Sequence, residues 1–157
     1  MHRRTIVWLA ASLSAIGAAP RAHAQGFIEI TPTGSAVTSS TSDVNVPANS
    51  VDNDPSTRWS GNGDGAWIAY DLGSVRTVAS VSVAVYQGTS RSNRFDLQVS
   101  TDKVSWTTVW SGQSSGTTTA QETYDFPDVA ARHVRYVGHG TATSPWNSVT
   151  ELDVFGR

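Results

Sequence analysis

Two aspartates two positions apart give this sequence its clearest potential for chemistry. Asp52 and Asp54 lie in the polar segment 49–59, and Thr57 follows three positions after the second aspartate. Hard cations such as Ca²⁺ take about six to eight oxygen ligands from carboxylates, hydroxyls and carbonyls on a bent loop. The helix-loop-helix calcium pattern is excluded, because its Gly and Glu positions are occupied here by Thr57 and Gly63. The alternative is a polar turn whose aspartates bond only local backbone amides.

Groups that could catalyse a reaction are scarce. Residues 25–157 contain two histidines, His133 and His139, and no cysteine for thiol chemistry. Residues 112–116 match the G-x-S-x-G pattern of a nucleophile elbow, but that motif needs a helix after the serine. Here three threonines lead into another strand-like segment. We therefore expect a flexible loop there and a domain without intrinsic enzyme activity.

Aromatic and basic side chains favour binding over catalysis. Arg91, Asn93 and Arg94 lie in a polar loop, and Trp146 follows a second loop that is expected at one end of the fold. An aromatic face for a sugar ring, together with arginine forks for carboxylates, would suit an acidic saccharide. The alternative is that the loop arginines are only solvated. Most of the tryptophans after residue 24 are expected in the core, because large aromatics dominate β-sandwich interiors: Trp59, Trp67, Trp106, Trp110 and Trp146.

The first 24 residues have the pattern of a secretory signal peptide. A positive segment, residues 2–4, precedes an apolar run at 6–19, and Ala-His-Ala at 22–24 is a small-x-small cleavage site. The apolar run is too short for a membrane anchor, although a retained N-terminal anchor is the alternative. We expect cleavage after Ala24, a secreted or periplasmic location, and one domain at residues 25–157.

The domain after the signal is acidic and has no disulfide. Without Arg3, Arg4 and Arg21 it has eight basic residues against thirteen acidic ones, a net charge of −5. An acidic surface does not attract nucleic acid non-specifically, and no later segment is apolar enough to span a membrane. Because there is no cysteine, stability must come from a hydrophobic core and, if the acidic loop binds one, a metal ion.

The hydrophobic pattern predicts an all-β fold. Val81, Val83 and Val85 alternate with other residues at a period of two, as do apolar residues in 95–99. No segment shows a convincing helical period, and turn signals recur about every ten residues, which is typical of a β-sandwich or barrel. Gly73 and Ser74 are expected to close one strand. The expected strands are residues 66–72, 75–86, 95–100, 105–110, 122–126, 132–137 and 149–155.

Several motifs together resemble the discoidin (coagulation factor V/VIII type C) domain. The residues are Asp-Asn-Asp-x-x-Thr-Arg-Trp-Ser at 52–60, Trp-Ile-Ala-Tyr-Asp-Leu-Gly at 67–73 and the segment 95–106, followed by two closing strands near 131–137 and 148–154. Within that group the chain is most similar to bacterial carbohydrate-binding modules of family 32 that are attached to alginate and other polysaccharide lyases. The resemblance implies a β-sandwich jelly roll of the galactose-binding-domain type.

The resemblance also implies a structural calcium site and a sugar site. The vertebrate members usually join their ends by a disulfide, which this chain lacks; a metal between the first loop and the last strand would replace it. Galactose-binding members often have a His after the strand that matches residues 78–86, whereas this chain has Gln87 and Gly88. Carried over by position, the calcium ligands are the Asn49 carbonyl, the Asp52 and Asp54 side chains, the Thr57 hydroxyl and carbonyl, the Thr150 carbonyl and the Glu151 side chain. The sugar-contacting positions are Asn62, Tyr86, Arg91, Arg94, His139 and Trp146.

These observations predict a secreted, calcium-stabilised, non-catalytic module that binds a polysaccharide, with an acidic uronate polymer such as alginate favoured. Two alternatives remain open at this point. The chain could be the N-terminal module of a longer polysaccharide lyase, and therefore have a tethered catalytic domain as partner. It could instead be an adhesion domain that binds protein and no sugar. Membrane binding is not expected, because the loops that would carry hydrophobic spikes are rich in Ser, Gly and Asn.

Overall fold

The alternating valines of the expected central strand lie in the longest strand of the protein. The computed structural model describes residues 26–157, so the predicted signal peptide at residues 1–24 lies outside the described residues. The elements in the described range are the strands β1 (Ile28–Glu29), β2 (Val37–Ser39), β3 (Trp59–Asn62), β4 (Ala66–Val85), β5 (Arg94–Ser100), β6 (Thr107–Gln113), β7 (Glu122–Gly138) and β8 (Trp146–Gly156), and the 3₁₀ helices η1 (Gly34–Ala36) and η2 (Pro47–Val51).

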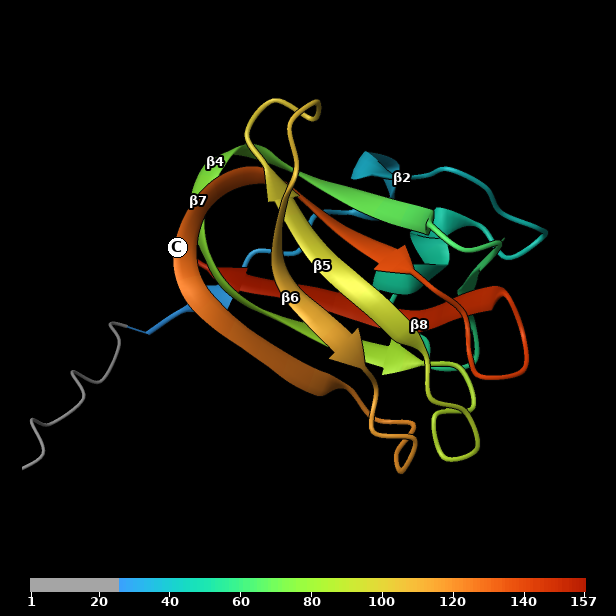
Figure 1. Cartoon of the computed structure of the whole chain (residues 1–157). Coiled ribbons are helices and arrows are strands. Elements are labelled where there is room, and N and C mark those ends of the chain that lie inside the picture. The colour runs from blue at the N-terminus through green and yellow to red at the C-terminus, as the bar shows by residue number, and fades with distance from the viewer. Residues whose placement is uncertain (1–25) are drawn as a thin grey trace, which may run out of the picture.

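Strands β4 and β7 bend together and so contribute to both layers of a sandwich. They pair antiparallel along most of their length, with a register shift between Asp71 and Arg76. The N-terminal part of β4 and the C-terminal part of β7 form one layer with β2, β5 and β6. Their other halves form the second layer with β8, which also pairs with β1 and β3. Figure 1 shows the two long strands curling side by side around one edge of the fold.

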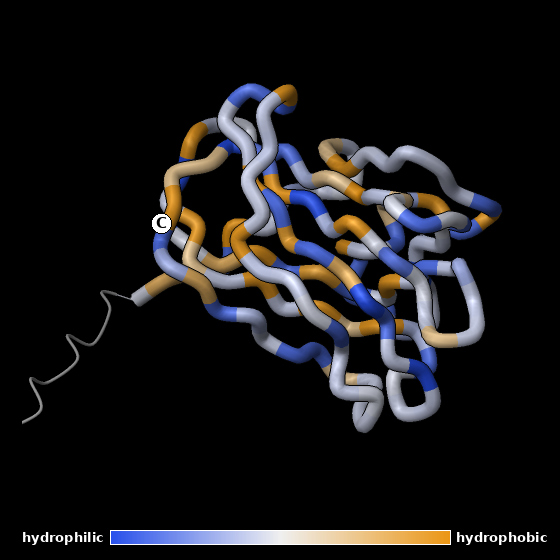
Figure 2. The backbone as a smooth tube through the Cα atoms, in the orientation of Figure 1, coloured by the Kyte–Doolittle hydropathy of each residue, from blue (hydrophilic) through white to orange (hydrophobic). Residues whose placement is uncertain are grey.

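The core lies between these layers and is rich in aromatic rings. Trp59, Phe95 and Tyr136 are completely buried, and the Phe95 ring stacks on that of Tyr136 with centroids 4.6 Å apart. The valines of β4 and Leu152 of β8 close the other side of this cluster. Figure 2 shows hydrophobic segments along the strands, whereas the loops at the end away from the C-terminus are mostly neutral or hydrophilic. The all-β sandwich prediction is confirmed.

Some predicted strand boundaries were wrong. Gly73 and Ser74 do not end a strand: Gly73 adopts a φ of +80°, and pairing resumes beyond it, so the segment is a bulge within β4. Residues 122–126 and 132–137 are likewise parts of the single strand β7. Sequence alone does not show that β4 and β7 continue through these segments, because similar residues form bulges and turns. Pairing with the neighbouring strand decides between the two. Within residues 26–157 no helix is long and apolar enough to cross a membrane.

The expectation that most tryptophans are core residues was also wrong. Trp59 is fully buried, and Trp110 packs against the core from its rim. Trp67 and Trp106 are only partly buried, and Trp146 is 39% exposed. Trp146 is therefore a surface residue at the start of β8, a position from which its ring can contact a ligand.

Candidate functional site

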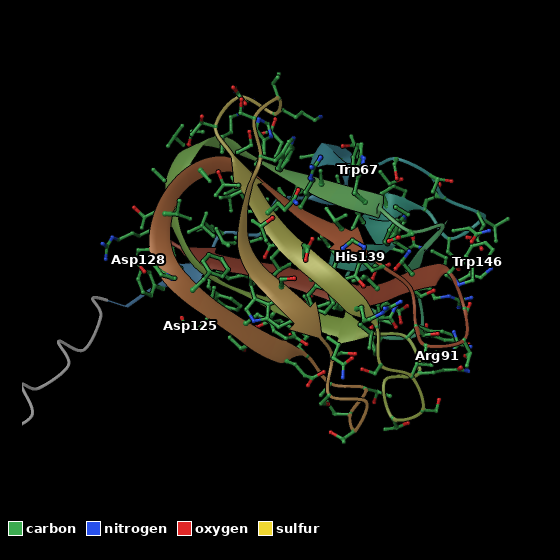
Figure 3. All side chains as sticks on the ribbon, viewed as in Figure 1. Trp67, Arg91, Asp125, Asp128, His139 and Trp146 are labelled. Atoms are coloured by element: carbon green, nitrogen blue, oxygen red, sulfur yellow. The ribbon has the colours of Figure 1, made fainter. Side chains whose placement is uncertain are left out.

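Loops from distant parts of the sequence surround a cavity of about 670 Å³ at one end of the sandwich. Figure 3 shows Arg91 and Trp146 at this end, opposite Asp125 and Asp128 near the C-terminus. Strands β3 and β8 pair here and form one wall. The cavity is lined by Asp43, Arg58, Ser60, Tyr86, Ser90, Arg91, Ser92, Thr141, Ala142, Thr143, Ser144, Trp146 and Ser148.

Two arginines meet on one aromatic ring in this cavity. The Arg58 guanidinium carbon lies 4.0 Å from the centre of the Tyr86 ring, and that of Arg91 lies 5.3 Å from it. Arg58 Nε also donates a hydrogen bond to Ser60 Oγ at 3.1 Å, which fixes the orientation of its guanidinium plane. Within residues 26–157 neither arginine forms a salt bridge with a carboxylate. Their terminal N–H groups are thus available to an anionic ligand.

One acidic side chain lies at the rim of the same cavity. The backbone N–H of Asn45 donates to Asp43 Oδ1 at 2.7 Å and holds the pKa of Asp43 below its usual value, and the charge of Arg58 adds to this effect. Asp43 therefore stays ionised near neutral pH. A carboxylate in the cavity would be repelled by Asp43 and attracted by the two arginines, so these charges favour one orientation of an anionic ligand.

The structure brings together half of the predicted sugar-contacting residues. Tyr86, Arg91 and Trp146 line the cavity. Asn62 pairs with Trp146 in the β3–β8 register but is not among the cavity-lining residues. Arg94 and His139 line a different surface depression, described below. The sugar-contacting role of all six residues stays a prediction.

Arg58 is the main cavity residue that sequence reasoning missed. It lies between Thr57 of the acidic loop and the buried Trp59, and its loop was interpreted as a metal site alone. The sequence does contain a signal for Arg58. Neighbouring residues of a strand point to opposite faces, so a residue next to the buried Trp59 is expected to point away from the core. The facing partner Tyr86 lies 28 positions away, so only the fold shows that the two side chains meet.

A second depression, of about 610 Å³, is organised by His139. His139 Nδ1 lies 2.6 Å from Asp64 Oδ1, and Nε2 lies 3.2 Å from Asp96 Oδ2. Arg94 Nη2 donates to the His139 carbonyl at 3.2 Å. The contact with Asp64 raises the pKa of His139 above its usual value, with Asp96 adding to the shift, and it lowers the pKa of Asp64. The protonated ring thus links three segments: the β3–β4 turn, β5 and the β7–β8 loop.

This arrangement predicts a pH-dependent stability. Because the folded-state pKa of His139 is raised, its contribution is fully present below the usual histidine pKa of about 6.5 and is lost as pH rises through the raised value. Asp64, whose pKa is lowered, contributes above about pH 4 and loses this as pH falls. The melting temperature of the protein relative to that of His139→Gln should therefore be higher at about pH 5.5 than at about pH 8.5. A difference that does not change with pH would contradict the assignment.

Asn147, completely buried on β8, holds the cavity loops in place. Its Nδ2 lies 3.0 Å from the Gly63 carbonyl and 3.3 Å from those of Gly61 and Pro145. Its Oδ1 accepts a hydrogen bond from Gly140 N at 2.8 Å. One amide side chain thus connects the β3–β4 turn with the β7–β8 loop, which leads into Trp146. No sequence motif identified it.

The predicted metal ligands lie where η2 meets β8. Thr57 Oγ1 lies 2.7 Å from Asp52 Oδ2, 3.2 Å from the Asp54 carbonyl and 3.4 Å from the Asn49 carbonyl. The Asp54 carboxylate is exposed and accepts hydrogen bonds from Ser56. Within residues 26–157 no three acidic or histidine side chains converge as a metal-binding group. Any cation here would therefore depend on backbone carbonyls and the Thr57 hydroxyl as well as on carboxylates.

Glu151 tests whether these groups fit a cation. It is only 9% exposed, and within the described part of the chain neither of its carboxyl oxygens has a hydrogen-bond partner. Burial raises the pKa of Glu151 to about 7; the charges of Asp153 and Asp52 add to the shift, and the nearby backbone N–H of Asn53 opposes it. A buried carboxylate without a partner, beside a second carboxylate, is costly unless a positive charge neutralises it. The oxygen-rich set fits a hard cation such as Ca²⁺.

Comparison with known proteins gives the following matches. The model of the F5/8 type C domain matches residues 35–152. The CBM32 of AlyQ in complex with 4,5-unsaturated mannuronic acid is 47% identical over 76% of this chain and 93% of that chain, with a TM-score of 0.75. Truncated AlyQ with CBM32 and alginate lyase domains is 42% identical over 84% of this chain and 34% of that one, with a TM-score of 0.79.

A pectin-binding carbohydrate-binding module is 26% identical over 76% of this chain and 88% of that chain, with a TM-score of 0.72. No curated protein sequence matches significantly. Each of these structures contains a carbohydrate-binding module. Their descriptions name an unsaturated mannuronic acid as ligand, alginate lyase domains, and pectin binding, respectively.

Proposed function

Because this chain belongs to the F5/8 type C domain family and is a carbohydrate-binding module of the CBM32 type, we propose that it binds an acidic uronate polysaccharide such as alginate. The family resemblance predicted from the sequence is confirmed. The observation that carries the proposal is the pair of arginines on Tyr86, because their free N–H groups match a carboxylate and the nearby Trp146 offers an aromatic face.

The binding mode follows from the shape and charge of the cavity. A guanidinium held against an aromatic ring loses little further freedom when it binds a carboxylate, so the cost of ordering the side chain is small. The hydroxyls of Ser60 and Ser148, 3.0 Å apart on neighbouring strands, offer hydrogen bonds to sugar hydroxyls at the cavity wall. The AlyQ module in complex with 4,5-unsaturated mannuronic acid supports a uronate as the ligand class.

We also propose that the module acts beside a polysaccharide-degrading domain, of the same chain or of an associated protein. The AlyQ structure that combines a CBM32 with alginate lyase domains supports this arrangement. Tethering raises the effective concentration of the enzyme near its substrate, so a weak module is useful in that setting. Export through a signal peptide at residues 1–24, with cleavage after Ala24, stays part of the proposal.

A calcium ion between the acidic loop and β8 is a further part of the proposal. Asp52 and Glu151 would hold it together with the carbonyls of Asn49 and Thr150 and the hydroxyl and carbonyl of Thr57; Asp54 is a further predicted ligand. The unpartnered carboxylate of Glu151 supports it. The ion would supply the positive charge that this buried carboxylate lacks, and it would connect the first loop to the last strand.

The test is retention on polysaccharide in affinity electrophoresis. The protein should be retarded by alginate, less by pectin and not by a neutral galactan. Arg58→Ala and Arg91→Ala should each weaken alginate binding about 10- to 100-fold, the loss expected for a hydrogen bond to a charged group. Arg76→Ala, which removes the same charge from the bend of β4, is the matched control. A folded protein that no glycan retards would contradict the proposal and favour a protein-binding adhesion domain.

A further inference from the structure

An arginine on the outer face of the sandwich repeats the chemistry of the cavity. Arg135 of β7 places its guanidinium carbon 4.1 Å from the centre of the Trp106 ring. Its Nε donates to Gln98 Oε1 of β5 at 2.7 Å, and Gln98 Nε2 in turn lies 3.1 Å from Thr108 Oγ1 of β6. A line of side chains across three neighbouring strands thus fixes this guanidinium.

The parallel with Arg58 is close. In both places Nε donates to a side-chain oxygen, and the guanidinium carbon lies about 4 Å from the centre of an aromatic ring. Neither arginine forms a salt bridge with a carboxylate within residues 26–157. The terminal N–H groups of Arg135 also form no hydrogen bond within residues 26–157. An arginine oriented in this way is prepared for a bidentate contact with a carboxylate.

The carboxylates near Arg135 are engaged by other groups. Asp71 is engaged by Arg132, with nitrogen–oxygen distances of 2.8 and 3.0 Å. Asp102 Oδ1 accepts hydrogen bonds from the backbone amides of two following residues. His133, between Asp71 and the Trp106 ring, is 6% exposed, and Lys103 lies in the adjoining turn. Asp96, two residues before Gln98 on the same face of β5, contacts His139 and Ser111 instead. Arg135 therefore has no carboxylate partner within residues 26–157, on a face that carries charges of both signs beside aromatic rings.

A second tryptophan extends this area along the sheet. Arg135 pairs with Ala69 of β4, and Trp67, two residues earlier on the same face of β4, pairs with Val137. Strand geometry places Trp67 about 7 Å along and about 5 Å across from Arg135. Trp67 and Trp106 are both partly exposed. Figure 3 shows Trp67 on β4, apart from the sandwich end where Arg91 and Trp146 lie.

We propose that Trp67, Trp106 and Arg135 form a second binding site for uronate residues of the same polysaccharide, on the outer face of the sheet β4–β7–β5. The free arginine fork would bind a carboxylate, and the two rings would contact sugar faces on either side of it. This inference rests on the proposed function, because it takes the ligand class from the cavity. Its consequence is bivalency: one domain could contact a long chain twice, or join two chains.

The experiment separates the two sites by ligand length. Alginate polymer and a mannuronate monosaccharide are each titrated into the protein, Arg91→Ala, Arg135→Ala and the control Arg76→Ala. Arg135→Ala should bind the monosaccharide in the cavity as the unmodified protein does, but should bind the polymer about 10-fold more weakly, since avidity is lost. The double variant Arg91→Ala with Arg135→Ala should lose polymer binding altogether.

A second measurement does not depend on any substitution. In NMR spectra of the unmodified protein, mannuronate tetrasaccharide should shift the indole N–H resonances of Trp67 and Trp106 as well as that of Trp146. Equal polymer binding by Arg135→Ala and Arg76→Ala, with unshifted Trp67 and Trp106 resonances, would overturn the second site while Arg91→Ala still shows the cavity to be functional. If the unmodified protein binds no uronate at all, both the second site and the proposed function are overturned.

Discussion

Chelating calcium is expected to lower the melting temperature of this domain by about 10 °C. A ligand present at 100 times its dissociation constant stabilises the native state by about 2.7 kcal/mol, and for a domain of this size each kcal/mol corresponds to about 3–5 °C. The physical reason lies at Glu151, whose carboxylate is buried beside Asp52 without a hydrogen-bond partner in residues 26–157. The measurement is thermal unfolding in excess calcium and in excess EGTA.

Two substitutions make this prediction sharper. Asp52→Asn should lower the melting temperature in calcium to the value that the unmodified protein has in chelator, with little further loss in chelator. Glu151→Gln should also abolish the calcium response, but in chelator it should be at least as stable as the unmodified protein, because it removes a buried charge that has no partner. Asp125→Asn, at the opposite end of the sandwich (Figure 3), is the control and should keep the full response. An unmodified protein that melts at the same temperature in both conditions would contradict the metal site.

The fold was predictable because its main signals are local. The alternation of Val81, Val83 and Val85 places one face of β4 in the core, and the same period identifies β5. The acidic loop could be singled out because Asp52 and Thr57 are close in sequence, and they are in direct contact in the structure. The prediction that a strand ends at Gly73 was wrong. Strand β4 continues through this residue because β7 bends with it, and the residues of β4 alone do not show how β7 bends.

The candidate sites were less predictable, because they depend on pairs distant in sequence. Trp146 and Arg91 could be proposed from loop position and residue type, and both line the cavity. Arg58 lies 28 positions from Tyr86, and Arg135 lies 29 positions from Trp106. No local pattern therefore predicts that either arginine contacts its aromatic ring. Arg94 and His139, which the family resemblance assigned to the sugar site, line the second depression with Asp96, and their sugar-contacting role stays a prediction.

Asn147 has the largest expected effect among the residues that only the structure identifies. Asn147→Ala should destabilise the domain by about 3 kcal/mol, because the buried N–H of Gly140 loses its acceptor, at a cost of about 1–3 kcal/mol, and the removed side chain leaves a cavity in a completely buried position. The carbonyls of Gly63 and Pro145 keep a backbone donor each, so they contribute less. The side chain also fills the space beside Gly138, where an added Cβ would clash with its Oδ1. The melting temperature should fall by about 10 °C.

The same substitution should weaken uronate binding even at temperatures where the variant is folded, because Asn147 joins the loop that leads into Trp146 to the turn that follows its strand partner Asn62. Without that amide the position of the Trp146 ring is no longer fixed relative to Arg58, and part of the binding energy is spent on ordering the loops. Asn62→Ala is the matched control for stability, since Asn62 is exposed and pairs with Trp146 only through the backbone register. Melting curves and alginate titrations at 15 °C below each midpoint measure the two effects separately. Unchanged affinity in a destabilised Asn147→Ala would mean that the amide stabilises the fold without positioning the cavity.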